Sequence, residues 1–305
     1  MISEKITRRD VHGIVLLDKP GRMTSNQALQ AVKRLFGAKK AGHTGSLDPL
    51  ASGLLPICLG EATKVSAFLL DADKEYLVTG ALGIRTATGD AEGTTVETCE
   101  VPELDERVIR QTLVRFTGEI MQTPPMYSAL KHQGQRLYDL ARDGVEVPRK
   151  PRSVHIRELE LLSFDQTSLS LRVRCSKGMY VRTLIEDIAA ALGTCGYVAS
   201  LRRLAVGPYG RSIRMHSLAE LQDRSATAPE TLSEWLLPID SAVAQWPAAK
   251  LATDAEWYFC RGQAVMTGQV LERGPVRVYG MNRLLGLGES MADGRIASRR
   301  LLKLH

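Results

Sequence analysis

Strand-like runs that follow one another directly constrain the fold of this chain more than any other feature. SVHIRELELLSF (153–164) is followed almost at once by SLSLRVRC (168–175), and both show part of the period of two that is typical of strands. Elsewhere a strand-like run, GYVASLRRLAVGPYG (196–210), follows the helix-like TLIEDIAAALG (183–193). Strands therefore come in adjacent pairs as often as they alternate with helices. This predicts an α+β fold with a mixed, mainly antiparallel sheet rather than a doubly wound one.

The length of the chain and the distribution of its prolines indicate two units. The chain has 305 residues, and a typical domain size of ~150 residues predicts two domains. The segment LLPIDSAVAQWPAAK (236–250) carries Pro238 and Pro247 and is typical of a linker. A helix-like ATDAEWYFCRG and short glycine-punctuated β-runs follow it. We therefore expect a larger unit at 1–249 and a small β-rich unit at 250–305.

Local patterns predict the first elements of the larger unit. HGIVLLDKP (12–20) is expected to form a short buried strand, and KEYLVTGALG (74–83) another. TSNQALQAVKRLFG has the apolar spacing of an amphipathic helix, for which Thr24 or Ser25 is the expected N-cap.

Two further helices are expected in the first half of the chain. One runs from Glu61 to Leu70. The other lies within ELDERVIRQTLVRFTGEI, where Leu104, Val108 and Ile109 are expected to face inward.

The charge balance and the hydropathy pattern limit the partners and the location. Forty basic residues against 34 acidic ones leave a net charge of +6, which is compatible with a polyanionic partner. The N-terminal sequence MISEKITRRDVHG has no apolar signal region, and no apolar run approaches the ~18 residues of a membrane span. We expect a cytoplasmic protein that does not enter a membrane.

The cysteines and histidines do not show metal-ligand spacing. The cysteines are odd in number, scattered, and never form a CxxC pair; they are Cys58, Cys99, Cys175, Cys195 and Cys260. This pattern predicts reduced, mostly buried thiols, and neither a disulfide framework nor a zinc site. The six histidines form no HxxxH or similar spacing. We therefore expect no metal.

The most unusual stretch is GHTGSLDPLASGLL, residues 42–55, which contains a single carboxylate, Asp48. Asp followed by Pro is a common helix start, with Asp as the N-cap, and that is one interpretation of Asp48. The three glycines favour another, because they let the backbone approach a ligand closely. A phosphate-binding loop is disfavoured because neither GxxxxGK[ST] nor GxGxxG is present and because the carboxylate would repel a phosphate. A nucleophilic or general-base aspartate fits the stretch better.

Several longer blocks then resemble one known family. They occur in the order found in the TruB family of tRNA pseudouridine synthases: HGIVLLDKPGRMTS, GHTGSLDPLASGLLPICLGEATK, KEYLVTGALGIRTATGD, SKGMYVRTLIEDIAAALG and AVGPY. The resemblance covers about residues 9–210, and the tail resembles the PUA module of that family. It implies isomerisation of uridine at tRNA position 55, in the T-loop, by base flipping and without a cofactor.

The resemblance also implies catalytic roles. Asp48 is similar to the aspartate shared by pseudouridine synthases, and an ionised carboxylate serves either to attack C1′ or C6 or to deprotonate C2′. Arg182, in GMYVRT, is expected to pair with a carboxylate and keep it ionised. Asp90 is expected to complete an Asp–Arg–Asp network, with a turn aspartate as the alternative. Tyr76 is expected to stack on the flipped uracil, its hydroxyl helping to remove the C5 proton.

A second set of residues is implied to contact the substrate. His43 is similar to the family histidine that props the RNA open where the base leaves the stack. Tyr180 is expected to pack beneath Tyr76, and Leu201 to contact the base. Motif positions that line the active site are matched by Lys19, Pro20 and Lys64, which by composition alone would be solvated charges and a strand terminator.

RNA binding is expected in two further places. Residues 122–152 are turn-rich and form an excursion from the core, and from Lys131 onward six basic residues stand against three acidic ones. A solvated loop would look the same, but the family has a mobile insertion here that closes on the T-stem-loop, which favours a phosphate-contacting clamp. The C-terminal ASRRLLKL adds a small basic patch.

The sequence thus predicts a tRNA pseudouridine-55 synthase that acts as a monomer without an obligatory protein partner. Two alternatives stay open: a tRNA-binding or folding factor with incidental modification, and the catalytic subunit of an RNA-guided particle. The long excursion at 122–152 resembles the stand-alone type and disfavours the second alternative.

Overall fold

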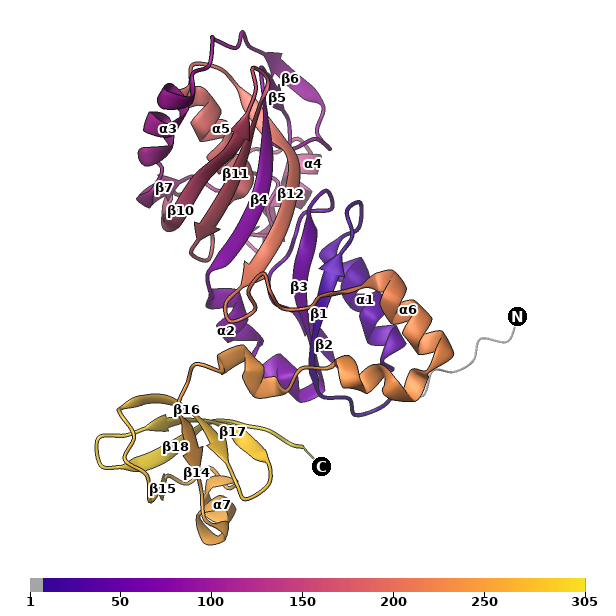
Figure 1. Cartoon of the computed structure of the whole chain (residues 1–305), viewed down its shortest axis with the longest axis vertical. Helices are drawn as coiled ribbons and strands as arrows, with labels where there is room; N and C mark the ends of the chain where they lie inside the picture. Colours follow the sequence, from indigo (N-terminus) through magenta and orange to yellow (C-terminus); the bar gives the residue numbers. More distant parts are fainter. Residues whose placement is uncertain (1–7, 305) are drawn as a thin grey trace.

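A mixed nine-stranded sheet forms the larger part of the molecule, for which the computed structural model describes residues 8–304 (Figure 1). The strand order is β13-β1-β3-β12-β4-β11-β10-β7, with β2 paired to β3 outside this path. Only the β1–β13 and β3–β12 pairs are parallel. The predicted mixed, mainly antiparallel sheet is confirmed. The strands are β1 Gly13–Lys19, β2 Ala41–His43, β3 Ser52–Leu59, β4 Lys74–Leu82, β7 Gly118–Gln122, β10 Arg152–Phe164, β11 Ser168–Cys175, β12 Gly196–Val206 and β13 His216–Ser217.

Helices pack on this sheet at both ends. Helices α3 and α5 lie together against the half that contains β4, β10 and β12, and α1 and α6 lie together beside β1 and β3 (Figure 1). The α-helices are α1 Ser25–Leu35, α2 Ser66–Asp71, α3 Glu106–Val114, α4 Leu137–Arg142, α5 Val181–Ala191, α6 Leu218–Thr227 and α7 Thr253–Phe259. The 3-10 helices are η1 Gly60–Lys64, η2 Pro229–Trp235 and η3 Ile239–Val243. None of the helices within residues 8–304 is long and apolar enough to cross a membrane.

Strand β1 is buried on both faces, as the apolar run predicts. Val15 and Leu17 enter the core that also contains buried residues of α1 and α5. Ile14 and Leu16 point the other way, into a second core formed with α2, η3 and a strand of the C-terminal sheet. The alternation of side chains along a strand therefore connects two cores through a single element.

The helix predictions hold with two differences, at Val108 and at Val65. The N-cap of α1 is Thr24, in a capping box with Gln27, whereas Ser25 points to another loop. Leu104, just before α3, and Ile109 within it are buried but Val108 is 48% exposed, so the prediction for Val108 is wrong. Successive helical residues are rotated by about 100°, which places Val108 off the buried stripe. The helix expected from Glu61 is interrupted at Val65, between η1 and α2.

The C-terminal unit is β-rich, as expected, and has a core of its own. Its five-stranded sheet has the order β14-β16-β17-β18-β15 and packs with α7. The strands are β14 Ala248–Lys250, β15 Val265–Met266, β16 Gly274–Tyr279, β17 Leu284–Ser290 and β18 Arg295–Leu301. The segment interpreted as a linker is packed rather than free. It contains η3, whose Ile239 and Val243 are buried in the second core, and ends in β14.

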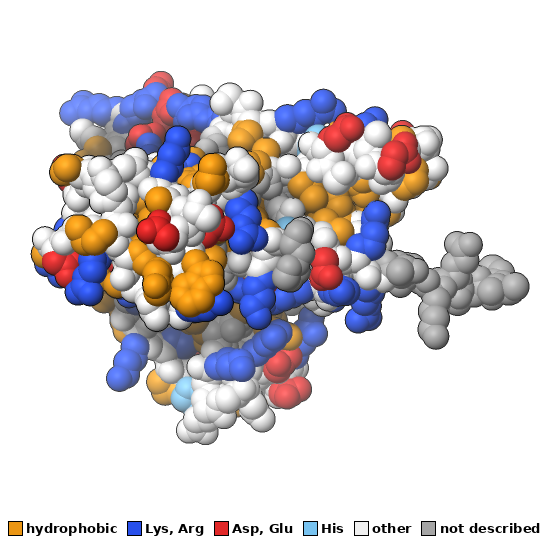
Figure 2. Space-filling view, turned by 90° about the horizontal axis from the view of Figure 1, so that it is seen from below, with side chains coloured by type: hydrophobic (Ala, Val, Ile, Leu, Met, Phe, Trp, Pro, Cys, Tyr) orange, Lys and Arg blue, Asp and Glu red, His pale blue; other side chains and the backbone are white. Residues whose placement is uncertain are grey.

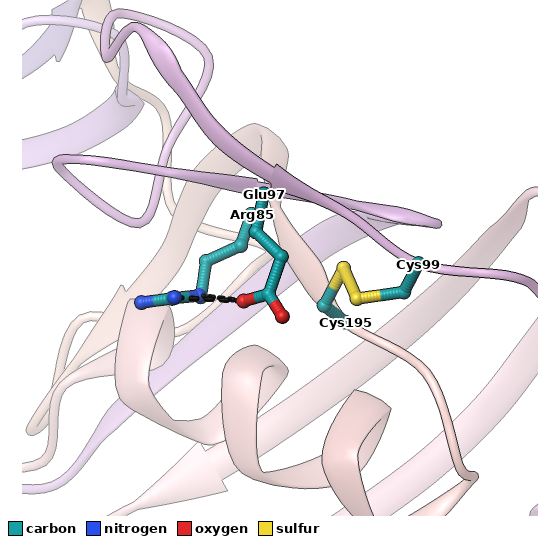
Figure 3. Close-up of a disulfide and its surroundings, with 4 residues drawn as sticks. All are labelled: Arg85, Glu97, Cys99 and Cys195. Carbon is teal, nitrogen blue, oxygen red and sulfur yellow. Dashed lines mark hydrogen bonds and ion pairs between the residues drawn. A yellow bond between two sulfur atoms is a disulfide. The ribbon is translucent and has the colours of Figure 1, made fainter.

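Cys99 and Cys195 form a disulfide, so the prediction of reduced cysteines is wrong for this pair (Figure 3). The two residues are 96 positions apart. Gly83 brings them together, because its carbonyl accepts from Cys99 and its N–H donates to the Cys195 carbonyl, both at 2.8 Å. The bridge ties the β5–β6 hairpin (Ile84–Thr86 and Thr95–Thr98), braced by an Arg85–Glu97 ion pair, to the start of β12. Of the other three, Cys58 and Cys175 are buried and Cys260 is exposed.

A thiol count tests the disulfide directly. Protein purified without reductant and unfolded in guanidinium should show three reactive thiols, rising to five after reduction. Cys99→Ser should raise the unreduced count by one, because it frees Cys195. Five thiols in the unreduced parent, or a count that falls on Cys99→Ser, would show that the bridge does not form.

Candidate active site

Asp48 lies in the irregular loop between β2 and β3. The residues after it form strand β3, not a helix, so the helix-start interpretation of Asp-Pro is not realised. The loop is tied down beside Asp48 by Ser25, whose hydroxyl donates to the Leu47 carbonyl at 3.0 Å and accepts from the Leu47 N–H at 2.8 Å. The carboxylate is thus presented by a loop whose backbone is fixed at Leu47, directly before Asp48.

Arg182 holds the Asp48 carboxylate with its planar fork. Its Nε lies 3.0 Å from one carboxylate oxygen and its Nη2 3.2 Å from the other. The same guanidinium donates to the carbonyls of Thr88 at 2.8 Å and Tyr127 at 2.7 Å. Arg182 stands at the start of α5 and its side chain is only 5% exposed. A bidentate pair of this kind fixes both the charge and the direction of the carboxylate.

Asp90 is a second carboxylate near Arg182. Its carboxylate is 3.9 Å from the Arg182 Nε and is almost fully buried. It also accepts from the Thr88 hydroxyl at 2.5 Å and from the Glu92 N–H at 3.1 Å. The geometry is therefore that of an Asp–Arg–Asp network, built on a turn that Asp90 itself stabilises.

The Asp48 side chain is 38% exposed, which leaves it open to a ligand. Burial of the carboxyl raises its pKa, while the neighbouring Arg182 guanidinium acts in the opposite direction. The Arg182 fork favours the ionised carboxylate, while partial burial removes some of its hydration. That combination suits a nucleophile or a base.

Lys19 bonds the backbone of the Asp48 loop, and Pro20 supplies a second carbonyl to the same ammonium group. Lys19 is fully buried, and its ammonium group donates to the carbonyls of Pro20 at 2.9 Å, Met23 at 2.5 Å and Pro49 at 3.4 Å. Burial lowers the pKa of Lys19 to about 8. Its contacts connect the turn after β1, at Pro20 and Met23, with Pro49, which directly follows Asp48.

Tyr76 and Leu201 lie on neighbouring strands. Tyr76 of β4 pairs with Arg203 of β12, and Val78 pairs with Leu201. Residues opposite each other in an antiparallel pair share a face of the sheet, so Tyr76 and Leu201 face the same side. Burial raises the pKa of the Tyr76 phenol, and the Arg203 guanidinium acts against this rise.

His43 ends β2 at the entrance of the loop. Its Nδ1 is buried and has no hydrogen-bond partner among the described residues. Burial, and then the charge of Arg203, lower its pKa below the ordinary value, so the ring is neutral at neutral pH.

Two residues expected at the site have other contacts. The Tyr180 ring lies 4.9 Å from the Arg152 guanidinium, and its backbone is paired with the Gln122 side chain. The structure does not bring Lys64 to the Asp48 cluster. Its ammonium group bonds Glu61 and the Leu301 carbonyl, at the junction with the C-terminal unit.

Sequence reasoning missed Arg203, the largest fully buried side chain of the described residues. A signal was present, because the period of two in LRRLAV places Arg203 on the same face as the apolar Leu201. An arginine at an inward position of a strand needs partners, and it therefore marks a site for closer inspection.

Three models of one family match consecutive parts of the chain. The "TruB family pseudouridylate synthase (N terminal domain)" matches residues 33–181, "tRNA pseudouridylate synthase B C-terminal domain" matches 182–244, and "Pseudouridine synthase II TruB, C-terminal" matches 247–302. The chain belongs to the TruB family. The first of these matches contains Asp48, Tyr76 and Asp90, and the second begins at Arg182.

Curated members of the TruB family are similar over nearly the whole chain. The tRNA pseudouridine synthase B of Coxiella burnetii (strain RSA 331) is 54% identical over 98% of this chain and 97% of its own length. That of Nitrosococcus oceani is 52% identical over 96% of each chain. Among solved structures, a chain in the crystal structure of a Cbf5–Nop10–Gar1 complex superposes with a TM-score of 0.73 at 26% identity, over 99% of this chain and 87% of that one.

Gly53 offers a test of how closely the start of β3, just after the Asp48 loop, is fitted to β12. It has a φ of +98°, and a Cβ there would lie 2.3 Å from the Arg203 carbonyl oxygen. Gly118 has a similar φ of +94° but nothing within 4 Å of the same position. Gly118→Ala should therefore lower the free energy of unfolding by only about 1–2 kcal/mol, the cost of the left-handed backbone conformation for a residue with a Cβ. Gly53→Ala should cost roughly 2 kcal/mol more, because β12 must move. Urea denaturation measures both, and equal losses would contradict the close fit.

Proposed function

We propose that this TruB-family chain isomerises uridine to pseudouridine at position 55 in the T-loop of tRNA. The observation that carries the proposal is the partly exposed Asp48 carboxylate held by Arg182, in a chain about half identical to tRNA pseudouridine synthases B over nearly its full length. The names of these relatives support the reaction and the tRNA substrate. Position 55 rests on the sequence resemblance.

The reaction assigns a task to each group of the site. The N1–C1′ bond of the uridine breaks, a C5–C1′ bond forms, C5 loses a proton and N1 gains one. Asp48 acts in its ionised form, whether it attacks C1′, attacks C6 or takes the C2′ proton. Arg182 keeps the carboxylate ionised and aimed, and Asp90 adds a second carboxylate near the Arg182 guanidinium. Tyr76 stacks on the uracil, with its hydroxyl available for the C5 proton.

Access to the uridine requires base flipping, since C1′ and C5 of a stacked nucleotide are not open to a protein carboxylate. The neutral ring of His43, at the entrance of the loop, suits insertion into the RNA where the base has left the stack. Leu201, on the same sheet face as Tyr76, supplies an apolar contact for the flipped base. These roles are proposed for His43 and Leu201 by resemblance and by position.

The tRNA backbone is proposed to contact two basic regions. In the insertion 122–152, Arg136 and Arg142 flank the Tyr138 ring beside a groove of about 430 Å³. A second groove of about 410 Å³ lies at the junction with the C-terminal unit, lined by Thr63, Lys64, Ala67, Arg299, Arg300 and Leu301. Figure 2, seen from the side of the C-terminal unit, shows many Lys and Arg side chains and fewer acidic ones on this face. We propose Lys64 as part of this second surface, and residues 250–305 with β14 as a PUA-like RNA-binding unit.

We propose that the chain acts alone rather than in an RNA-guided particle. The structural neighbour with a TM-score of 0.73 comes from a complex with other proteins. The relatives at 48–54% identity are instead named for tRNA modification and match over 94–100% of their own length.

Substitution of Asp48 tests the proposed function. Asp48→Asn keeps the shape of the side chain and removes the ionised oxygen, so pseudouridine formation in an unmodified T-stem-loop transcript should fall by at least about a thousandfold. The dissociation constant for the RNA should change little. Asp73→Asn, which removes a carboxylate from an ion pair with Arg157 outside the cluster, is the matched control and should be as active as the parent. A turnover of Asp48→Asn within tenfold of the parent would exclude Asp48 from catalysis.

The pH dependence follows from the raised pKa of Asp48. A carboxyl with a raised pKa takes up its proton at a higher pH than an exposed aspartate, and the protonated form is inactive. The single-turnover rate constant should therefore fall on the acid side with a midpoint above the ordinary value of about 3.9. His43→Gln should keep this acid limb, which separates it from titration of the histidine. A midpoint at or below the ordinary value would contradict the desolvated carboxylate.

The groove at the domain junction predicts a specific salt effect. Arg300 is exposed in the groove, so Arg300→Ala should weaken the binding of full-length tRNA and reduce the slope of log K against log salt by about one. An isolated T-stem-loop should bind as before. Arg295→Ala, in the same strand but paired with Asp293, is the control and should change neither. Equal losses for stem-loop and tRNA would mean that Arg300 contacts the T-arm itself.

A further inference from the structure

Arg203 is a buried cation without a buried anion. It is 1% exposed and has no carboxylate partner among the described residues. Its Nε donates to the Leu54 carbonyl at 2.7 Å and its Nη2 to the Gly45 carbonyl at 3.1 Å. A charge withdrawn from water and compensated only by dipoles is unfavourable for stability. The placement of such a residue therefore points to a role beyond packing.

The two carbonyls lie at the two ends of the loop that carries Asp48. Gly45 precedes Asp48 by three positions and Leu54 follows it by six. One planar guanidinium thus spans the base of the loop, which a lysine ammonium group cannot do with the same geometry. The backbone of Arg203 is fitted equally closely, because it pairs with Gly53 of β3, where only a glycine leaves room.

The opposite neighbour of Arg203 is Tyr76. The two residues are register partners in the β12–β4 pair, so both side chains stand on one face of the sheet. The guanidinium favours the ionised phenol and counteracts the rise in pKa that burial causes in Tyr76. It also lowers the pKa of His43, after burial itself. One buried charge therefore acts on the loop, on the stacking ring and on the histidine.

We propose that Arg203 is a positioning residue for the reaction, which clamps the Asp48 loop at both ends and fixes the Tyr76 phenol opposite it. The proposal rests on the proposed isomerase function for its kinetic consequence. Arg203 is only 1% exposed, so it acts through the loop and Tyr76 and not by contact with the RNA. Loss of the clamp would shift Asp48 and Tyr76 relative to the uridine without removing either group.

The test uses full-length Arg203→Lys, which keeps the charge and loses the fork. Arg277→Lys is the matched control, because the Nε of Arg277 also donates to a backbone carbonyl, that of Trp246 at 2.9 Å, in the C-terminal unit. For each variant we would measure the melting temperature, the dissociation constant for an unmodified T-stem-loop, the single-turnover rate constant and the hydrogen exchange of peptides covering 44–55. Arg203→Lys should fold and bind within about threefold of the parent, while its rate constant falls by roughly ten- to a hundredfold. Exchange should rise in 44–55 and stay unchanged in α5.

The outcomes separate positioning from the alternatives. Unchanged exchange in 44–55, or raised exchange with an unchanged rate constant, would overturn the proposal. Equal losses in binding and rate would make Arg203 an RNA contact and would also overturn it. If Arg203→Lys does not fold under conditions where Arg277→Lys does, Arg203 serves stability alone and the proposal fails. A parent without pseudouridine formation would instead refute the proposed function, and the exchange measurement would still test the clamp.

Discussion

The ion pair between Asp48 and Arg182 is the interaction on which the site depends. The Arg182 guanidinium connects four separate segments: the Asp48 loop, the turn with Thr88 and Asp90, the segment with the Tyr127 carbonyl, and α5 itself. No two of these segments are close in sequence, so the pair exists only in the folded chain. Removal of Asp48 would leave the buried Arg182 guanidinium with Asp90, at 3.9 Å, as its remaining carboxylate. The network is thus a requirement on the fold as much as on the chemistry.

Three buried cations contact the Asp48 loop or its carboxylate, and each is solvated by backbone carbonyls. Lys19 bonds the backbone of its own turn and of Pro49, Arg182 bonds Thr88 and Tyr127, and Arg203 bonds Gly45 and Leu54. Fixed carbonyl dipoles replace water around these charges, while the Asp48 carboxylate stays partly exposed. Such preorganised surroundings need no rearrangement when charge moves during a reaction. Gly45, with a φ of +110°, is the loop glycine whose carbonyl faces one of these cations, Arg203.

The sequence predicted the local elements and the chemistry better than the long-range packing. The period of two gave the antiparallel β10–β11 pair, and the capping pattern at Thr24 gave the start of α1. The resemblance named Asp48, Arg182, Asp90 and Tyr76, and the structure brings the first three together. The features that the sequence did not predict depend on the pairing of distant segments. The Cys99–Cys195 bridge, the placement of Lys64 at the domain junction and the burial of Arg203 all follow from the order of strands in the sheet.

The same hydrogen bonds connect the active site with the insertion at 122–152. Nη2 of Arg182 donates both to Asp48 and to the Tyr127 carbonyl, at the base of that insertion. Gln122, where the insertion begins, is paired with the backbone of Tyr180, two residues before Arg182, and Arg152, where it ends, lies over the Tyr180 ring. Both ends of the basic segment are therefore fastened to the start of α5. Because a guanidinium is rigid and planar, a displacement of Tyr127 must be followed by Arg182 or must break one of its bonds. The geometry of the Asp48 pair and the position of the insertion are thus not independent in this fold.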